Sequence, residues 1–79
     1  MRQFAGKRYW LVGASEGLGA ALAEALSRAG AEVILSARNE AGLQAVASGL
    51  PGPSQCQPVD VTDADSVRRA ADAIGPVDG

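Results

Sequence analysis

The sequence predicts an α/β fold in which helices cover a doubly wound parallel sheet. Short apolar runs alternate with longer segments whose apolar residues fall at helical spacing, and the connections between these segments are short. Parallel strands need crossovers of this kind, and such crossovers are right-handed. The 79 residues are therefore expected to form a βαβαβα arrangement.

The first strand is expected at Arg8–Val12, where an apolar run with an aromatic pair suits a strand that is covered on both faces. We place Trp10 of this strand in the core. Residues 18–29 then carry leucine and alanine on one helical stripe, and Gly30 ends this helix as a C′ residue would.

The second strand is expected at residues 33–35, and Asn39 is the expected N-cap of the helix that follows. The inward face of that helix consists of Leu43, Val46 and Leu50. The third strand is expected at residues 55–61. Because Pro58 cannot donate a hydrogen bond to a neighbouring strand, the third strand should lie at an edge of the sheet.

The last helix is expected to begin at a T-x-x-D capping pattern, with Thr62 as its N-cap. Residues 77–79 then resemble the approach to a fourth strand. In a doubly wound sheet the first strand is central. We therefore expect further chain beyond Gly79, because the first strand would otherwise expose unpaired backbone at an edge.

Composition narrows the classes of partner. The net charge is −2, from 7 basic and 9 acidic residues, and no basic stripe indicates nucleic acid. The apolar runs are far shorter than the ~20 residues that cross a bilayer. One cysteine and no histidine give neither an internal disulfide nor a histidine-containing zinc site. The expectation is a cytoplasmic protein with no metal, membrane or nucleic-acid partner.

Three glycines lie between the first strand and the first helix. The free N–H groups and the dipole at a helix start attract a phosphate. Gly13 would make the tight exit from the strand, and Gly17 would let a diphosphate touch the backbone. Gly19 would let the helix lie close to the first strand. These are the roles that glycines have in a dinucleotide-binding turn.

Residues 12–19 read VGASEGLG, and their G-x-x-x-G-x-G spacing resembles the short-chain dehydrogenase/reductase family, whose members typically carry T-G-A-S-x-G-I-G here. The resemblance covers the whole chain but only the N-terminal part of a usual member. It implies that residues 1–79 are the N-terminal dinucleotide-binding part of a single Rossmann domain, whose remainder is absent from this chain. It also places five residues at the cofactor: Gly13, Ser15, Gly17, Leu18 and Gly19.

The end of the second strand favours NADP(H) over NAD(H). An acidic residue there binds the 2′-hydroxyl of NAD, whereas an arginine accommodates the 2′-phosphate of NADP. Ala37 is not acidic, and Arg38 follows it. Glu16 argues for NAD, because a carboxylate repels a phosphate unless it points outward or pairs with Arg38. The alternative for Arg38 is a solvated side chain.

In the family, an Asp-Val pair at the end of the third strand contacts the adenine. The resemblance therefore implies that the Asp60 carboxylate accepts a hydrogen bond from the exocyclic amine and that Val61 packs on the ring. The alternatives are a solvated carboxylate near the next helix for Asp60 and simple packing for Val61.

The family reaction is hydride transfer between a nicotinamide cofactor and a small carbonyl or alcohol substrate, with a tyrosine as general acid/base. The family's serine and Y-x-x-x-K pair do not occur in these residues, and Gly13 stands four residues after Tyr9, where the lysine would be needed. No catalytic residue is therefore assigned. The full-length protein is expected to form a homo-oligomer. The alternatives are a non-catalytic dinucleotide-binding or scaffolding module, and an NAD-dependent enzyme.

Overall fold

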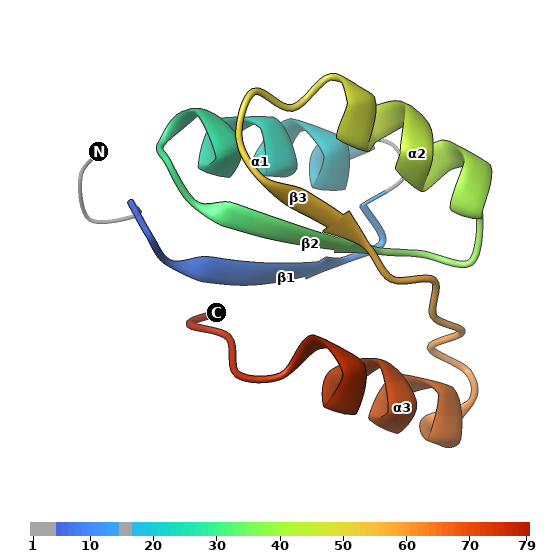
Figure 1. The fold of residues 1–79 in the computed structure, drawn as a ribbon. Helices are drawn as coiled ribbons and strands as arrows, with labels where there is room; N and C mark the ends of the chain where they lie inside the picture. Colours follow the sequence, from blue (N-terminus) through green and yellow to red (C-terminus); the bar gives the residue numbers. More distant parts are fainter. Residues whose placement is uncertain (1–4, 15–16) are drawn as a thin grey trace.

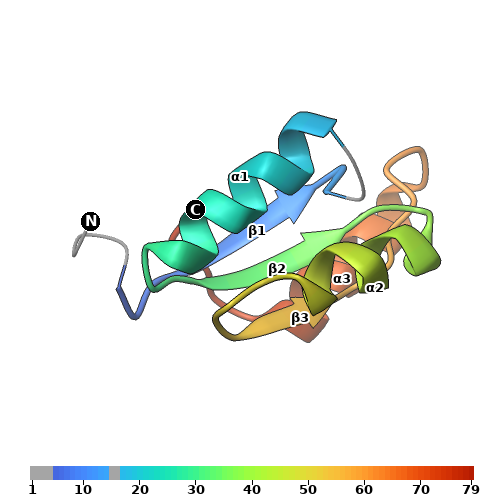
Figure 2. The ribbon, with the colours of Figure 1, turned by 90° about the horizontal axis from the view of Figure 1, so that it is seen from above.

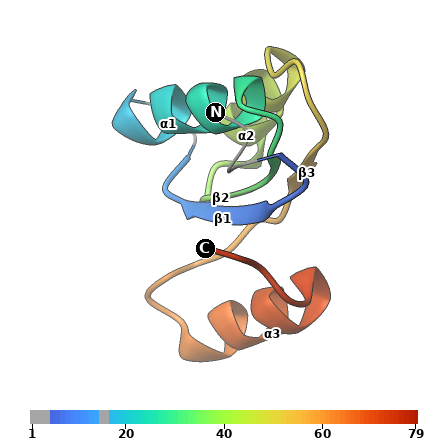
Figure 3. The ribbon, with the colours of Figure 1, turned by 90° about the vertical axis from the view of Figure 1, so that its left-hand side faces the viewer.

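The computed structural model describes residues 5–14 and 17–79. Strands and helices alternate along these residues: β1 (Arg8–Val12), α1 (Gly17–Arg28), β2 (Glu32–Ser36), α2 (Glu40–Ser48), β3 (Ser54–Cys56) and α3 (Ala64–Ile74). The three strands form one parallel sheet in the order β1-β2-β3. Helices α1 and α2 cover one face of the sheet, and α3 lies on the other face (Figure 1, Figure 3). The structure therefore confirms the predicted Rossmann-like βαβαβα fold.

The main core lies between the sheet and the pair α1 and α2. Seen from above, α1 runs over β1 and β2, and α2 runs over β2 and β3 (Figure 2). Val33 and Leu35 of the central strand are fully buried, and they pack with Leu26 of α1 and Leu43 of α2. Because alternate residues of a strand point to opposite faces, Ile34 is buried on the α3 side. Both faces of β2 are therefore covered, as a parallel strand requires.

The prediction that Trp10 lies in the core is wrong, because its side chain is only half-buried. It pairs with Ile34 in the register of β1 and β2, so both side chains lie on the α3 side of the sheet. The Trp10 indole N–H donates to Ser36 Oγ at 2.6 Å. A large ring with one polar group fits a surface that only one helix covers in the described part of the chain.

The third strand is shorter than predicted and ends at Cys56, so the expected span to Val61 is wrong. The reason is Pro58, which has no N–H to donate. The residues on either side of Pro58 still bond to β2 and the residue that follows it. Gln57 N–H donates to Leu35 O at 2.8 Å, and Val59 N–H donates to Ala37 O at 3.2 Å. Residues 57–59 therefore continue alongside β2. Among the described residues, β3 lies at an edge of the sheet, as predicted.

The caps of the two later helices differ in how well they were predicted. Asn39 is the N-cap of α2, and its side chain accepts from Gly42 N–H at 3.1 Å, which confirms the prediction. The N-cap of α3 is Asp63, which accepts from Asp65 N–H at 3.0 Å. The assignment of Thr62 as the cap is therefore wrong, because the Thr62 hydroxyl bonds elsewhere.

The outer edge of β1 is partly paired, which corrects the expectation of bare backbone there. Asp78 N–H donates to Arg8 O at 2.8 Å, and Trp10 N–H donates to Gly79 O at 2.9 Å. Arg8 N–H donates to Asp78 Oδ2 at 2.8 Å, and the Arg8 guanidinium donates to Pro76 O at 2.8 Å. Residues 78 and 79 thus begin to follow β1, as the predicted approach to a fourth strand requires.

Candidate dinucleotide-binding site

The turn between β1 and α1 contains two glycines in the left-handed region. The φ angle is +80° at Gly13 and +62° at Gly17, a conformation that side chains disfavour. A β-carbon added to either glycine would meet no atom within 4 Å. The backbone conformation therefore requires glycine at both positions, and the space beside them is open to a ligand.

Gly19 is constrained by contact and not by conformation. A β-carbon there would lie 2.5 Å from the carbonyl oxygen of Gly13 and 3.1 Å from Cα of Ala14. Both atoms belong to backbone, so no side chain can move aside. Gly19 was expected to let the helix lie close to the first strand, whereas the close approach is to Gly13 and Ala14 of the turn that follows β1.

Some N–H groups of the turn are already bonded. Gly13 N–H and Ala14 N–H both donate to the carbonyl oxygen of Ser36, at 2.7 and 3.2 Å. These bonds tie the turn to the end of β2. The N–H groups in the first turn of α1, which begins at Gly17, have no partner within the helix. Residues 15 and 16 lie outside the described residues. The structure therefore does not describe the predicted cofactor contact of Ser15 or the position of Glu16, whose charge argues for NAD.

Sequence reasoning missed Ser36 as a supporting residue of this turn. It ends β2, pairs with Val12 in the register of the parallel strands, and uses its carbonyl for the turn and its hydroxyl for Trp10. Every residue has a backbone carbonyl, so the residue type at position 36 does not indicate this role. Only the prediction that the ends of β1 and β2 are neighbours could have indicated it.

Two apolar side chains lie exposed beside the turn. Leu18 at the start of α1 is 86% exposed, and Val12 at the end of β1 is 52% exposed. The open space beside the turn therefore borders exposed apolar surface.

A hollow of about 260 Å³ lies beyond the ends of β2 and β3. We call it the strand-end hollow, and it is lined by Arg38, Pro58, Val59, Asp60 and Ser66. The structure thus brings together Arg38 and Asp60, which the sequence placed at the ends of two different strands. Val61 does not line this hollow, and it is exposed.

The carboxylate of Asp60 is held by its own turn. Asp60 Oδ1 accepts from the Thr62 hydroxyl at 2.6 Å and from Thr62 N–H at 3.0 Å. These two hydrogen bonds lower the pKa of Asp60 below its ordinary value, against an opposing effect of burial, and the positive charge of Arg38 adds the smallest contribution to the lowering. Asp60 N–H donates to Ser66 Oγ at 3.0 Å, which ties the same residue to α3. Asp60 is therefore an ionised acceptor with a fixed position.

Arg38 is exposed at the rim of the strand-end hollow. No carboxylate among the described residues lies within ion-pair distance of its guanidinium. The guanidinium is therefore available to an anion that enters the hollow.

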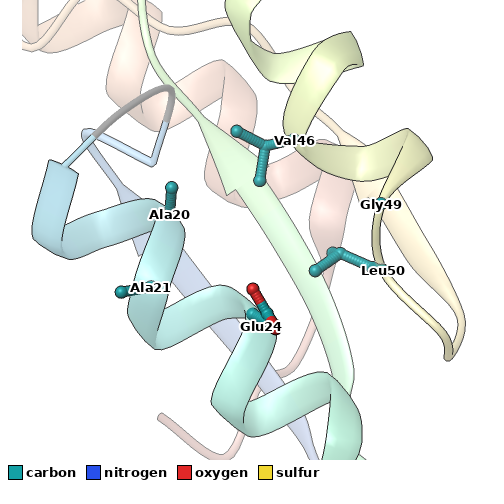
Figure 4. A pocket seen from close by; sticks show the side chains of 6 residues that line it. All are labelled: Ala20, Ala21, Glu24, Val46, Gly49 and Leu50. Carbon is teal, nitrogen blue, oxygen red and sulfur yellow. The ribbon is translucent and has the colours of Figure 1, made fainter.

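Two other features do not belong to this site. Burial, and then the negative charge of Glu40, raise the pKa of the Cys56 thiol, so its environment does not activate it as a nucleophile. A second hollow of about 200 Å³ lies between α1 and α2 and is lined by Ala20, Ala21, Glu24, Val46, Gly49 and Leu50 (Figure 4). Its charged residue, Glu24, pairs with Arg28 at 2.7 Å.

Comparison with known proteins identifies the family. Residues 7–79 match the family model described as short chain dehydrogenase, and the chain therefore belongs to the short-chain dehydrogenase family. It is 35% identical to the L-xylulose reductase of Bos taurus, over 96% of this chain and 31% of that protein. It is 40% identical to the gluconate 5-dehydrogenase of Gluconobacter oxydans, over 92% of this chain and 31% of that protein. The chain thus spans about a third of the length of these relatives.

Solved structures give the same result for the fold. A short-chain dehydrogenase/reductase of Mycobacterium marinum matches with a TM-score of 0.83 and 39% identity, over 90% of this chain and 29% of that one. A metagenomic short-chain oxidoreductase in complex with NADP matches with a TM-score of 0.82 and 33% identity, over 90% of this chain and 34% of that one. In the described part of the chain, no helix combines the length and the apolarity that crossing a membrane requires.

Proposed function

We propose that residues 1–79 are the N-terminal dinucleotide-binding part of a single Rossmann domain, and that they bind NADP(H) for an oxidoreductase. One observation carries the proposal: open space beside the glycine turn borders the first N–H groups of α1 at the carboxyl ends of parallel strands, where doubly wound sheets bind nucleotides. The residues present fit a dinucleotide, because added β-carbons at Gly13 and Gly17 would project into open space that a ligand can fill.

The pyrophosphate binds to the first turn of α1. The N–H groups of Gly17, Leu18 and Gly19 point into the turn, and the helix dipole adds about half a positive charge there. Ser15 contributes its hydroxyl as a further donor in this proposal. The exposed side chain of Leu18 contacts the apolar part of the cofactor next to the phosphates.

Arg38 selects NADP(H) over NAD(H). Its guanidinium is exposed, and the described residues place no carboxylate within ion-pair distance of it. A planar guanidinium can donate two parallel hydrogen bonds to a phosphate, and it gains much less from a neutral hydroxyl. The relative that is solved in complex with NADP supports this choice.

The adenine occupies the strand-end hollow. Asp60 lines the hollow with an ionised carboxylate, which accepts from the exocyclic amine of the base. Val61 does not line the hollow, but it is 60% exposed at the next position and covers the part of the ring that extends beyond the hollow.

The bound cofactor supplies a hydride that moves between its nicotinamide and a small carbonyl or alcohol substrate. The residues of this chain bind and orient the cofactor, and the serine, tyrosine and lysine that complete the family reaction lie outside them. In this proposal the full-length protein acts in the cytoplasm as a homo-oligomer.

A fluorescence titration tests the proposal. NADPH and NADH are added separately to the full chain, and the emission of the nicotinamide is followed. We expect saturable binding of NADPH with an affinity at least tenfold above that of NADH, because one charge-assisted phosphate contact contributes on the order of 1.5–3 kcal/mol. Absence of saturable binding of either dinucleotide would contradict the proposal.

A further inference from the structure

Thr62 forms hydrogen bonds that its sequence pattern does not indicate. It follows Asp60 by two positions and precedes α3, where a threonine would cap the helix, but Asp63 takes that role. The Thr62 hydroxyl and N–H instead both donate to Asp60 Oδ1, at 2.6 and 3.0 Å. Asp63 N–H donates to Asp60 O at 3.0 Å and closes the turn.

These bonds make the two oxygens of the Asp60 carboxylate different. Oδ1 receives two donors, whereas no donor among the described residues lies within hydrogen-bond distance of Oδ2. On the other side, the bond from Asp60 N–H to Ser66 Oγ holds the backbone against α3. The carboxylate therefore keeps one orientation, in which Oδ2 retains its capacity to accept.

Arg38 makes this orientation necessary. Its guanidinium lines the same strand-end hollow, and its charge acts on Asp60, yet the two side chains form no ion pair within 4.0 Å. A carboxylate without the Thr62 bonds could rotate toward the guanidinium. Such a pair would withdraw the cation from a phosphate and the acceptor from a base at the same time.

We propose that Thr62 is a positioning residue, which occupies Oδ1 of Asp60 so that Oδ2 accepts from the exocyclic amine of the adenine. The inference rests on the proposed function, because it requires a dinucleotide whose adenine enters the strand-end hollow. It assigns the choice of base to a residue that does not itself touch the ligand.

The test compares NADPH with its hypoxanthine analogue, in which a carbonyl oxygen replaces the exocyclic amine. Both are titrated into the full chain as wild type, Thr62→Val and Thr62→Ser. We expect wild type to bind NADPH on the order of tenfold more tightly than the analogue, as the loss of one hydrogen bond to a charged group implies. Thr62→Val loses the shorter of the two bonds and keeps the backbone one, so it should reduce this ratio several-fold, and Thr62→Ser, which keeps the hydroxyl, should restore it.

Asp60→Asn gives a second, independent measurement if Thr62→Val does not fold. With Oδ1 still held by Thr62, the amide nitrogen would take the place of Oδ2 and present a donor to the base. The preference should then reverse, because the hypoxanthine carbonyl accepts and the adenine amine does not.

The outcomes separate the two proposals. Failure of wild type to bind NADPH would refute the proposed function and this inference together. Binding of NADPH with no preference over the analogue would overturn the inference alone. The inference would also be overturned if Thr62→Val kept the wild-type ratio, or if Asp60→Asn lost the preference without reversing it.

Discussion

Two oppositely charged residues, Arg38 and Asp60, share the strand-end hollow without pairing. The sequence indicated Arg38 by its place at the end of the second strand, and it indicated Asp60 through the Asp-Val pair that resembles the family pattern. It could not select Thr62 or Ser66, because their contributions are hydrogen bonds that depend on how the loop from 57 to 63 folds. The type of a residue indicates the charge and length of its side chain. The orientation of a carboxylate depends on the folded turn, so the sequence does not indicate it.

Replacing Arg38 tests the choice of cofactor at the scale of one residue. Arg38→Asp should weaken the binding of NADPH by on the order of 10²-fold, because it removes a cation and adds an anion beside the 2′-phosphate. NADH should be affected much less. Titration of both cofactors measures the ratio, and Arg68→Asp is the matched control, because Arg68 is an exposed arginine on α3. An unchanged NADPH/NADH ratio in Arg38→Asp would remove this assignment.

The protonation of Asp60 gives a second prediction at this scale. Its folded-state pKa lies below the ordinary value of 3.8, so its contribution to stability is present above that value and is lost as the pH falls through the folded-state pKa. Thr62→Val removes the first cause of the shift, so the pKa should rise. Carbon NMR of the Asp60 carboxyl across an acid titration measures the midpoints in wild type and in Thr62→Val. Identical midpoints would contradict the hydrogen bond from Thr62 as the main cause of the lowered pKa.

At the scale of elements, the β1–α1 turn predicts different effects for its glycines. Gly19→Ala places a β-carbon 2.5 Å from Gly13 O, so the turn must shift, at a cost of about 1–3 kcal/mol. Gly17→Ala meets no atom within 4 Å but strains a residue at φ +62°, at a cost of about 1–2 kcal/mol. Thermal unfolding and NADPH titration should show a loss of stability and of binding in both variants, because the β-carbon of Gly17→Ala also enters the open space proposed for the diphosphate.

Gly49→Ala is the control for these variants. Gly49 has an ordinary φ of −93° at the C-cap of α2, and a β-carbon there would meet only Val46 O, at 3.6 Å. Its stability and NADPH affinity should match those of wild type. If Gly19→Ala behaved in the same way as Gly49→Ala, the close approach of α1 to the turn would not matter for binding.

The elements themselves were largely predictable, and the exceptions have local causes. Period and composition located β1, β2 and all three helices, because their apolar faces repeat over several residues. The end of β3 was not predictable, since Pro58 stops the strand while the chain still follows β2. The start of α3 was missed by one residue, because two neighbouring side chains competed for the role of cap.

At the scale of the whole molecule, Arg8 connects three parts of the chain. Its guanidinium pairs with Glu32 of β2 at 3.1 Å and donates to Pro76 O, while its N–H donates to Asp78 Oδ2. These bonds hold residues 76–79 beside β1. Sequence reasoning predicted that this segment approaches a strand but found no role for Arg8, because its partners are distant in sequence.

Arg8→Met tests this connection. The variant keeps an apolar stem but loses the guanidinium bonds, so residues 78 and 79 should separate from β1 more often. Amide hydrogen exchange should accelerate several-fold at Trp10 and Asp78, whose N–H groups bond across this contact. Arg28→Met is the control, because Arg28 pairs only within α1 and is 70% exposed. Equal exchange in both variants would argue against the role of Arg8.

The central claim is that bare amides at the start of α1 hold the pyrophosphate of a dinucleotide. Amide NMR of the ¹⁵N-labelled full chain during titration with NADPH tests it most directly. The account predicts that the largest shifts occur at Gly17, Leu18 and Gly19 and that all three saturate with one affinity. Saturable binding that leaves these three amides unmoved would contradict it.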